Sequence, residues 1–208
     1  MSNTKSYPTT NFNKYHCHHP FAINRIGNFL DNLTQLLTLI KPSYILSIGC
    51  GEGLAIKNIY EKGKINIEYC CGLDLNFDAL KMAKQMSTNV KFDAIKGDIY
   101  YLPSTLNRFD LILCLEVLEH LTFPGKVLKE ISQHFNGYCI FSVPNEPLYR
   151  LTRLLLFKQN IRQLGNHPEH LNHWSKNKFS RLLRKYFIID QLVTPFPWTI
   201  ALCHKKDN

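Results

Sequence analysis

The stretch Tyr44–Gly53 constrains the fold most, because an apolar segment runs directly into a glycine-rich turn. Aliphatic residues give its first half the character of a buried parallel strand: Ile45, Leu46 and Ile48. Glycines then follow at every second position: Gly49, Gly51 and Gly53. Because glycine has no Cβ, the chain can turn sharply there and a ligand can lie against bare backbone. Residues 54–60 have helical spacing, and a strand, a glycine turn and a helix in this order are typical of nucleotide pockets in α/β proteins.

Strand-like and helix-like segments alternate along the chain up to about residue 145. The pattern predicts strands at 44–48, 67–74, 90–98, 109–116 and 138–143, and helices at 21–40, 52–63, 77–86 and 124–135. Alternation of this kind predicts an α/β fold with a parallel sheet. Right-handed crossovers bring the carboxyl ends of parallel strands to one edge. We therefore expect Asp74, Asp98 and Glu116, which end three predicted strands, to meet the glycine turn at that edge.

The pattern changes after residue 145. Residues 147–157 are expected to be helical, 158–174 to form an irregular cap, and 175–187 to return to a helix. Two further strands, 188–193 and 198–203, are joined by only a few residues and should therefore be antiparallel. We expect the cap, residues 146–175, to select the substrate.

Size and composition indicate one folded domain over residues 1–208. Residues 1–20 are polar and are expected to form an arm or lid, and the His and Cys residues within Tyr15–Pro20 match no standard zinc spacing. The seven cysteines fall mostly in apolar runs, which indicates reduced thiols and a cytoplasmic protein. The start of the chain lacks the apolar core of a signal peptide, and no stretch approaches the about 20 apolar residues of a membrane span.

The formal net charge is +9, and the isoelectric point is about 9.2. A basic balance can indicate a nucleic-acid or anionic-membrane partner, or simply a solvated basic surface. The charge therefore leaves nucleic acid open as a partner, and it says nothing about oligomeric state.

The spacing of the glycines separates two kinds of nucleotide turn. The dinucleotide fingerprint needs its third glycine where this chain has Leu54, which argues against NAD. The turn resembles that of the class I S-adenosylmethionine (SAM)-dependent methyltransferases. The segments Ser142–Arg150 and Leu164–Ser175, with the run His-Leu-Asn-His-Trp-Ser, are similar to a group of small bacterial methyltransferases. The resemblance implies a Rossmann-like seven-stranded sheet in the order 3-2-1-4-5-7-6, with strand 7 antiparallel.

The resemblance also implies which residues bind SAM. The turn, with Cys50 among its glycines, would lie against the amino-acid tail and ribose, and Asp74 would accept both ribose hydroxyls. Asp98 would bind the adenine amine. The ordinary alternative for both acids is a turn or cap residue. Apolar and polar contacts would come from four more residues: Leu75, Ile99, Leu115 and Glu116. For Leu75 and Ile99, core packing is the equally ordinary alternative.

The pattern Glu116-x-x-Glu119-His120 also occurs in many methyltransferases. Residues at i, i+3 and i+4 would share one helical face. One interpretation is that the triplet forms the floor of the SAM pocket. The other is a divalent metal site completed by His170, as in the small-RNA 2′-O-methyltransferases, although hard Mg²⁺ prefers oxygen ligands.

Three histidines are candidates for a catalytic base: His120, His170 and His173. Capping a helix or holding a loop is their structural alternative. The chain is thus expected to be an enzyme that moves a methyl group from SAM to an oxygen, nitrogen or carbon of a small-molecule or lipid-like acceptor. The alternatives are a metal-assisted RNA 2′-O-methyltransferase and a SAM-binding protein without catalytic activity.

Overall fold

A computed structural model describes residues 20–63, 65–86, 91–102, 105–146 and 171–206. Its core is a seven-stranded sheet in the order β3-β2-β1-β4-β5-β7-β6. The strands are β1 (Tyr44–Ile48), β2 (Tyr69–Asp74), β3 (Lys91–Lys96), β4 (Leu111–Leu115), β5 (Tyr138–Pro144), β6 (Phe187–Val193) and β7 (Trp198–Lys205). The first five are parallel, and β7 runs antiparallel to both β5 and β6. The predicted strand order and the antiparallel seventh strand are confirmed.

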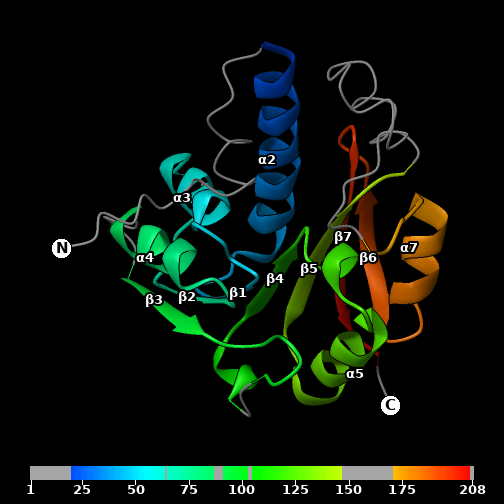
Figure 1. Cartoon of the computed structure of the whole chain (residues 1–208). Coiled ribbons are helices and arrows are strands. Elements are labelled where there is room, and N and C mark those ends of the chain that lie inside the picture. Colours follow the sequence, from blue (N-terminus) through cyan, green and yellow to red (C-terminus); the bar gives the residue numbers. More distant parts are fainter. Residues whose placement is uncertain (1–19, 64, 87–90, 103–104, 147–170, 207–208) are drawn as a thin grey trace.

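Five α-helices and two short 3₁₀ helices are described around this sheet (Figure 1). They are α2 (Pro20–Ile40), α3 (Leu54–Glu61), α4 (Phe77–Met86), α5 (Pro124–His134), α7 (Lys176–Leu183), η1 (Leu106–Arg108) and η2 (Leu118–His120). The boundaries lie within a few residues of the predicted ones. The helix expected at 147–157 lies outside the described residues.

Alternating side chains divide the core into two layers. On one face, α2, α3 and α4 pack against residues such as Ile45, Cys70 and Leu113. On the other face, α5 and α7 pack against residues such as Ile112 and Phe141. Neighbouring positions of β4 thus point to opposite layers, as the two-residue period of a strand requires.

Helix α2 has an apolar stripe at helical spacing: Ala22, Phe29, Leu30, Leu33, Leu36 and Leu37 are buried. The ring of Phe29 meets the ring of Trp198 edge-on, with 5.2 Å between centroids. Trp198 begins β7, so this contact joins the first described helix to the last strand. Figure 1 shows α2 standing upright above the middle of the sheet.

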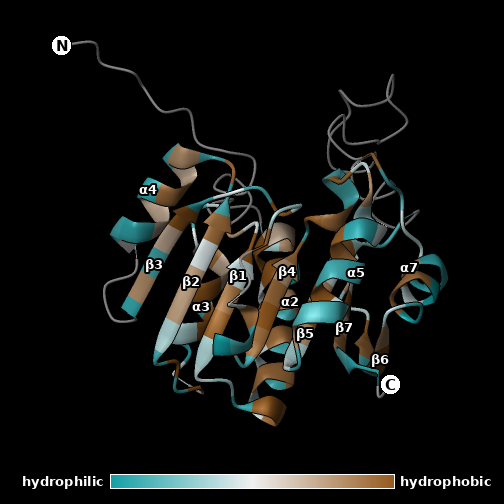
Figure 2. Ribbon diagram, turned by 90° about the horizontal axis from the view of Figure 1, so that it is seen from below, coloured by the Kyte–Doolittle hydropathy of each residue, from teal (hydrophilic) through white to brown (hydrophobic). Residues whose placement is uncertain are grey.

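The helices are distributed unevenly over the second face. Helices α3, α4 and α5 connect β1 to β2, β2 to β3, and β4 to β5, whereas the described part of the β3–β4 connection contains only η1. Figure 2 accordingly shows α5 and α7 over one half of this face and no helix over β3, β2 and β1.

Two further features bear on the sequence predictions. Every cysteine in the described ranges carries a free thiol. A search of the described helices finds none with the length and apolar character needed to cross a bilayer.

Removing the side chain of Leu33 should test the packing of α2. Leu33 is fully buried, so Leu33→Ala should lower the free energy of unfolding by about 2–5 kcal/mol through lost transfer energy and a cavity. Leu39 lies on the same helix but is 60% exposed, and Leu39→Ala should change the stability by less than about 0.5 kcal/mol. Urea unfolding measures both, and equal losses would contradict this packing.

Candidate functional site

The glycine turn follows β1 and is held by the end of β2. The backbone N–H groups of Gly49 and Cys50 donate to the Leu73 carbonyl at 2.7 and 3.2 Å. Gly49 has a φ of 65°, and a Cβ placed on it would lie 2.4 Å from Val117 Cγ2. Gly53 has a φ of 72° and caps α3. Glycine is therefore required at position 49 for two reasons: the backbone is left-handed there, and Val117, in the turn after β4, leaves no space for a Cβ.

Asp74 is the last residue of β2, and it bridges the turn and α4. Its Oδ2 accepts the N–H of Gly51 and its Oδ1 accepts the N–H of Asn76, both at 2.8 Å. Asn76 in turn caps α4, because its side-chain oxygen accepts the N–H groups of Asp78 and Ala79. A carboxylate has about four acceptor sites, so Asp74 can still take hydrogen bonds from a ligand.

Asp98 lies on the same edge of the sheet as Asp74. The N–H of Gly97 donates to the Asp74 carbonyl at 3.1 Å, and Asp98 follows directly. One Asp98 carboxylate oxygen accepts the Tyr100 N–H at 2.9 Å, as in an Asx turn. Nearby, Leu75 is 64% exposed whereas Ile99 is buried. An exposed leucine beside two acids fits a planar apolar group with polar edges, such as adenosine.

A small cavity of about 40 Å³ opens beside the turn. Its lining consists of Ser47, Gly49, Cys50, Glu52, Leu54, Ala55, Leu115 and Glu116. The sequence analysis selected Gly49, Cys50, Leu115 and Glu116 and missed Ser47 and Glu52. Glu52 is almost fully buried, although it stands between two glycines of the turn. Its position inside the motif was the available signal.

The Cys50 thiol is neutral at physiological pH. Burial, reinforced by the Asp74 carboxylate, raises the pKa of this thiol to about 12. Only a thiolate is a strong nucleophile. Cys50 can therefore line a site for an alkylating ligand without being alkylated itself.

The triplet Glu116, Glu119 and His120 does not share a helical face, which corrects the expectation from its spacing. Strand β4 ends at Leu115, Glu116 has a left-handed φ of 56°, and the short helix η2 begins only at Leu118. As a result Glu119 is buried, whereas His120 is exposed. Among the described residues no group of three His, Cys, Asp or Glu side chains could hold a metal ion. His170 lies outside the described residues.

The described end of the predicted cap, from Leu171 onward, packs on the turn after β4. The N–H groups of Leu171 and Asn172 donate to the Glu119 carbonyl at 2.9 and 3.0 Å. The Asn172 side chain donates to the Leu121 carbonyl at 2.6 Å. The sequence analysis assigned no role to Asn172, because its partners are far away along the chain.

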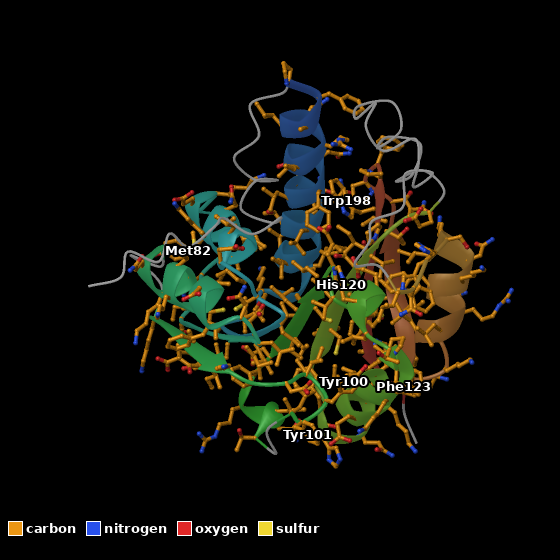
Figure 3. The ribbon with its side chains drawn as sticks, viewed as in Figure 1. Met82, Tyr100, Tyr101, His120, Phe123 and Trp198 are labelled. Carbon is orange, nitrogen blue, oxygen red and sulfur yellow. The ribbon has the colours of Figure 1, made fainter. Side chains whose placement is uncertain are left out.

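This packing brings His173 to Glu146. The N–H of Glu146 donates to the Trp174 carbonyl at 2.7 Å, and His173 Nδ1 lies 3.6 Å from Glu146 Oε1. Glu146 is 7% exposed, whereas about a third of the His173 side chain is accessible. Glu146 was also missed, although it lies only three residues after a predicted strand. Figure 3 shows His120 on the turn after β4, apart from Tyr100, Tyr101 and Phe123.

The chain matches a family model described as methyltransferase domain over residues 21–186. A ubiquinone biosynthesis O-methyltransferase from Coxiella burnetii (strain Dugway 5J108-111) is 28% identical over 173 residues. That match covers 74% of this chain and 70% of the Coxiella protein.

Solved structures share the fold. The methyltransferase domain of bacterial CtHen1-C superposes with a TM-score of 0.65 at 18% identity, covering 88% of this chain and 100% of that chain. Magnesium protoporphyrin IX methyltransferase (ChlM) from Synechocystis PCC 6803 with bound SAH gives a TM-score of 0.66 at 14% identity, covering 90% and 88%. At these identities the two structures show a common fold alone.

Two glycine substitutions should separate the ligand turn from the general effect of a left-handed residue. Gly49→Ala should lower the affinity for S-adenosylhomocysteine at least tenfold, because its Cβ would overlap Val117. Gly63 has a similar φ of 62° but no atom within 4 Å of an added Cβ. Gly63→Ala should therefore lose only about 1–2 kcal/mol of stability and keep its affinity. Calorimetric titration and urea unfolding measure both, and equal losses of affinity would contradict the assignment of the turn.

Proposed function

The chain belongs to the class I SAM-dependent methyltransferases, and from this premise we propose that it methylates a hydroxyl oxygen of a small acceptor molecule. The His173–Glu146 pair carries the proposal. His173 lies on the segment whose backbone binds the Glu119 carbonyl. Glu119 is three residues after Glu116, and Glu116 lines the cavity beside the glycine turn. An imidazole at that place suits removal of a hydroxyl proton. The similarity to ubiquinone biosynthesis O-methyltransferases supports oxygen as the acceptor atom.

The residues at the carboxyl edge of the sheet fit the methyl donor. In this proposal the ribose hydroxyls bind Asp74, and the adenine binds Asp98 between Leu75 and Ile99. The remaining donor contacts come from the residues of the turn and from the end of β4: Gly49, Cys50, Gly51, Gly53, Leu115 and Glu116. When bound, SAM supplies an electrophilic methyl group on a sulfonium.

His173 is proposed to accept the proton of the acceptor hydroxyl. Its Nδ1 faces Glu146, so Nε2 is the nitrogen that can act as the base. Glu146 is a positioning residue: its buried carboxylate orients the imidazole and favours the tautomer with the proton on Nδ1. His120 and His170 were equal candidates in the sequence. His120 is exposed on the short helix η2 after β4, and His170 lies outside the described residues.

The chain is proposed to act as one domain in which residues 146–175 select the acceptor and residues 1–20 form an arm or lid. The two described ends of the cap support this division. Glu146 at its start and Trp174 near its end are joined by a backbone hydrogen bond. The two described ends of the cap therefore lie side by side next to His173.

RNA is the second candidate acceptor, because one surface of the molecule is strongly basic. Helix α7 and the turn after it carry five exposed cations and no acid: Lys176, Lys178, Arg181, Arg184 and Lys185. A phosphate backbone would suit this surface, and binding would then weaken steeply with salt.

The acceptor class can be decided with the methyl-labelled donor. Purified protein is incubated with labelled SAM and a cell extract, and the label is then measured in the small-molecule, lipid and RNA fractions, with and without EDTA. We expect label in a hydroxyl-bearing small molecule, unchanged by EDTA. Label in RNA that disappears with EDTA would replace the proposal by the metal-assisted alternative. Formation of no labelled product would favour a binding protein.

The His173–Glu146 pair can be tested against a matched pair elsewhere. His173→Ala should lower kcat about 10²- to 10⁴-fold, the usual contribution of a general base. Glu146→Gln should lower kcat less, and both variants should keep their affinity for S-adenosylhomocysteine. His134 and Glu130 form a similar but exposed pair on α5, with 3.5 Å between Nε2 and Oε1. His134→Ala and Glu130→Gln should leave kcat unchanged. Normal turnover of His173→Ala on the identified acceptor would remove the base from the mechanism.

A further inference from the structure

The helix-free half of the sheet forms a groove, separate from the donor site. It is about 920 Å³ in volume and lies where the β3–β4 connection crosses the face without an α-helix in its described part. The groove is lined by Tyr44, Leu46, Glu68, Tyr69, Cys71, Leu73, Lys91, Asp93, Ile95, Lys96, Gly97, Tyr101, Thr105, Arg108 and Phe109. We call it the β1–β3 groove. Figure 2 shows the bare strands that form its floor.

The strand register arranges the floor in rows. One row crosses the three strands as Tyr44, Tyr69 and Lys91, and the next as Leu46, Cys71 and Asp93. Leu73 and Ile95 pair in a third row. The floor is therefore apolar along its middle, with aromatic rings at the end where the strands begin.

Apolar side chains remain accessible around this floor. Ile95 is 48% exposed and Tyr101 is 77% exposed. The rings of Tyr69 and Phe109 are nearly parallel, with 6.3 Å between centroids and 15° between planes. Exposed apolar and aromatic surface gathered in one concave place is typical of a binding site.

The acidic side chains of the groove have hydrogen-bond partners within the protein, whereas its basic side chains form no ion pairs within the described residues. The acids accept hydrogen bonds from tyrosines: Tyr44 to Glu68 at 3.0 Å and Tyr69 to Asp93 at 2.8 Å. The hydrogen bond to Glu68 raises the pKa of Tyr44, and burial together with Asp93 raises that of Tyr69, so both hydroxyls remain donors.

The cations have no such partners. Lys91, Lys96 and Arg108 are exposed and form no ion pair within the part of the chain that the structure describes. The Lys91 ammonium lies 5.8 Å from the centre of the Tyr69 ring. An anionic group beside an aromatic body would meet both the cations and the rings.

We propose that the β1–β3 groove is a second binding site, for an organic anion with a flat aromatic body. The ring would lie on the apolar floor beside Tyr69 and Phe109, and the anionic group would bind Lys91 and Arg108. The inference does not depend on which acceptor the methyltransferase uses, because the groove extends along the face of the sheet and meets the carboxyl edge at one end, near Gly97.

The volume favours a small molecule over a helix of a partner protein. Ligand cavities commonly measure about 300–1,000 Å³, a range that includes this groove. A three-turn helix is about 16 Å long and about 10 Å across, and therefore fills roughly 1,300 Å³. Such a helix would exceed the groove, whereas a two- or three-ring anion would fit within it.

The probe is 1-anilinonaphthalene-8-sulfonate, an aromatic sulfonate whose fluorescence rises on apolar surfaces. It is titrated into full-length protein saturated with S-adenosylhomocysteine, which keeps the probe out of the donor site. We expect saturable binding of one equivalent. The double variant Lys91→Glu/Arg108→Glu should weaken that binding at least tenfold.

The control makes the same change of charge elsewhere. Lys176→Glu/Lys185→Glu alters two exposed cations of the α7 region and should leave the affinity for the probe unchanged. Equal weakening by both double variants, or non-saturable binding, would overturn the proposal. Sedimentation velocity on the wild type tests whether a second copy of the chain occupies the groove. A dimer that the Lys91→Glu/Arg108→Glu variant dissociates would show that a second copy covers the groove, and would also overturn it.

Discussion

The proposed donor site depends on the hydrogen bonds by which the end of β2 holds the turn after β1. The Leu73 carbonyl accepts the N–H groups of Gly49 and Cys50, and the Asp74 carboxylate accepts those of Gly51 and Asn76. Two adjacent residues thus fix a turn with left-handed glycines and also the start of α4. Because these bonds are made within the protein, the turn is shaped before any ligand binds, and a preorganised site loses less entropy on binding.

The acceptor side depends on a different set of bonds, which converge on the turn after β4. Glu116 donates its N–H to Ser142 of β5, and Glu119 accepts two N–H groups through its carbonyl. The segment ending in His173 is therefore attached to the same turn whose first residue, Glu116, lines the cavity beside the glycine turn. A displacement of this turn would move the segment with His173 and the lining of the cavity together. The two chain segments therefore keep a fixed relative position without contacting each other directly.

Periodicity was enough to predict the strands, the helices and a parallel sheet, because buried parallel strands and amphipathic helices differ in period and length. It also placed Asp74 and Asp98 on one edge, since parallel strands leave no other arrangement. The strand order was predicted from the resemblance to methyltransferases. The triplet Glu116-x-x-Glu119-His120 was predicted wrongly because spacing cannot reveal that Glu116 leaves β4 with a left-handed φ. The roles of Glu146 and Asn172 were not predicted for another reason. Their partners come from segments far apart in the chain, and no local sequence pattern indicates such contacts.

Because the described part of the β3–β4 connection contains no α-helix, the groove extends to two residues that also support the proposed donor site. The side chain of Leu73 forms part of the floor of the β1–β3 groove, while its carbonyl holds the glycine turn. Gly97 joins them a second time, because its N–H binds the Asp74 carbonyl and its backbone lines the groove. A helix over β1–β3 would have buried this connection. A ligand bound at this end of the groove would contact the strand end on which the turn rests, and any coupling between the two sites would then be equal in both directions.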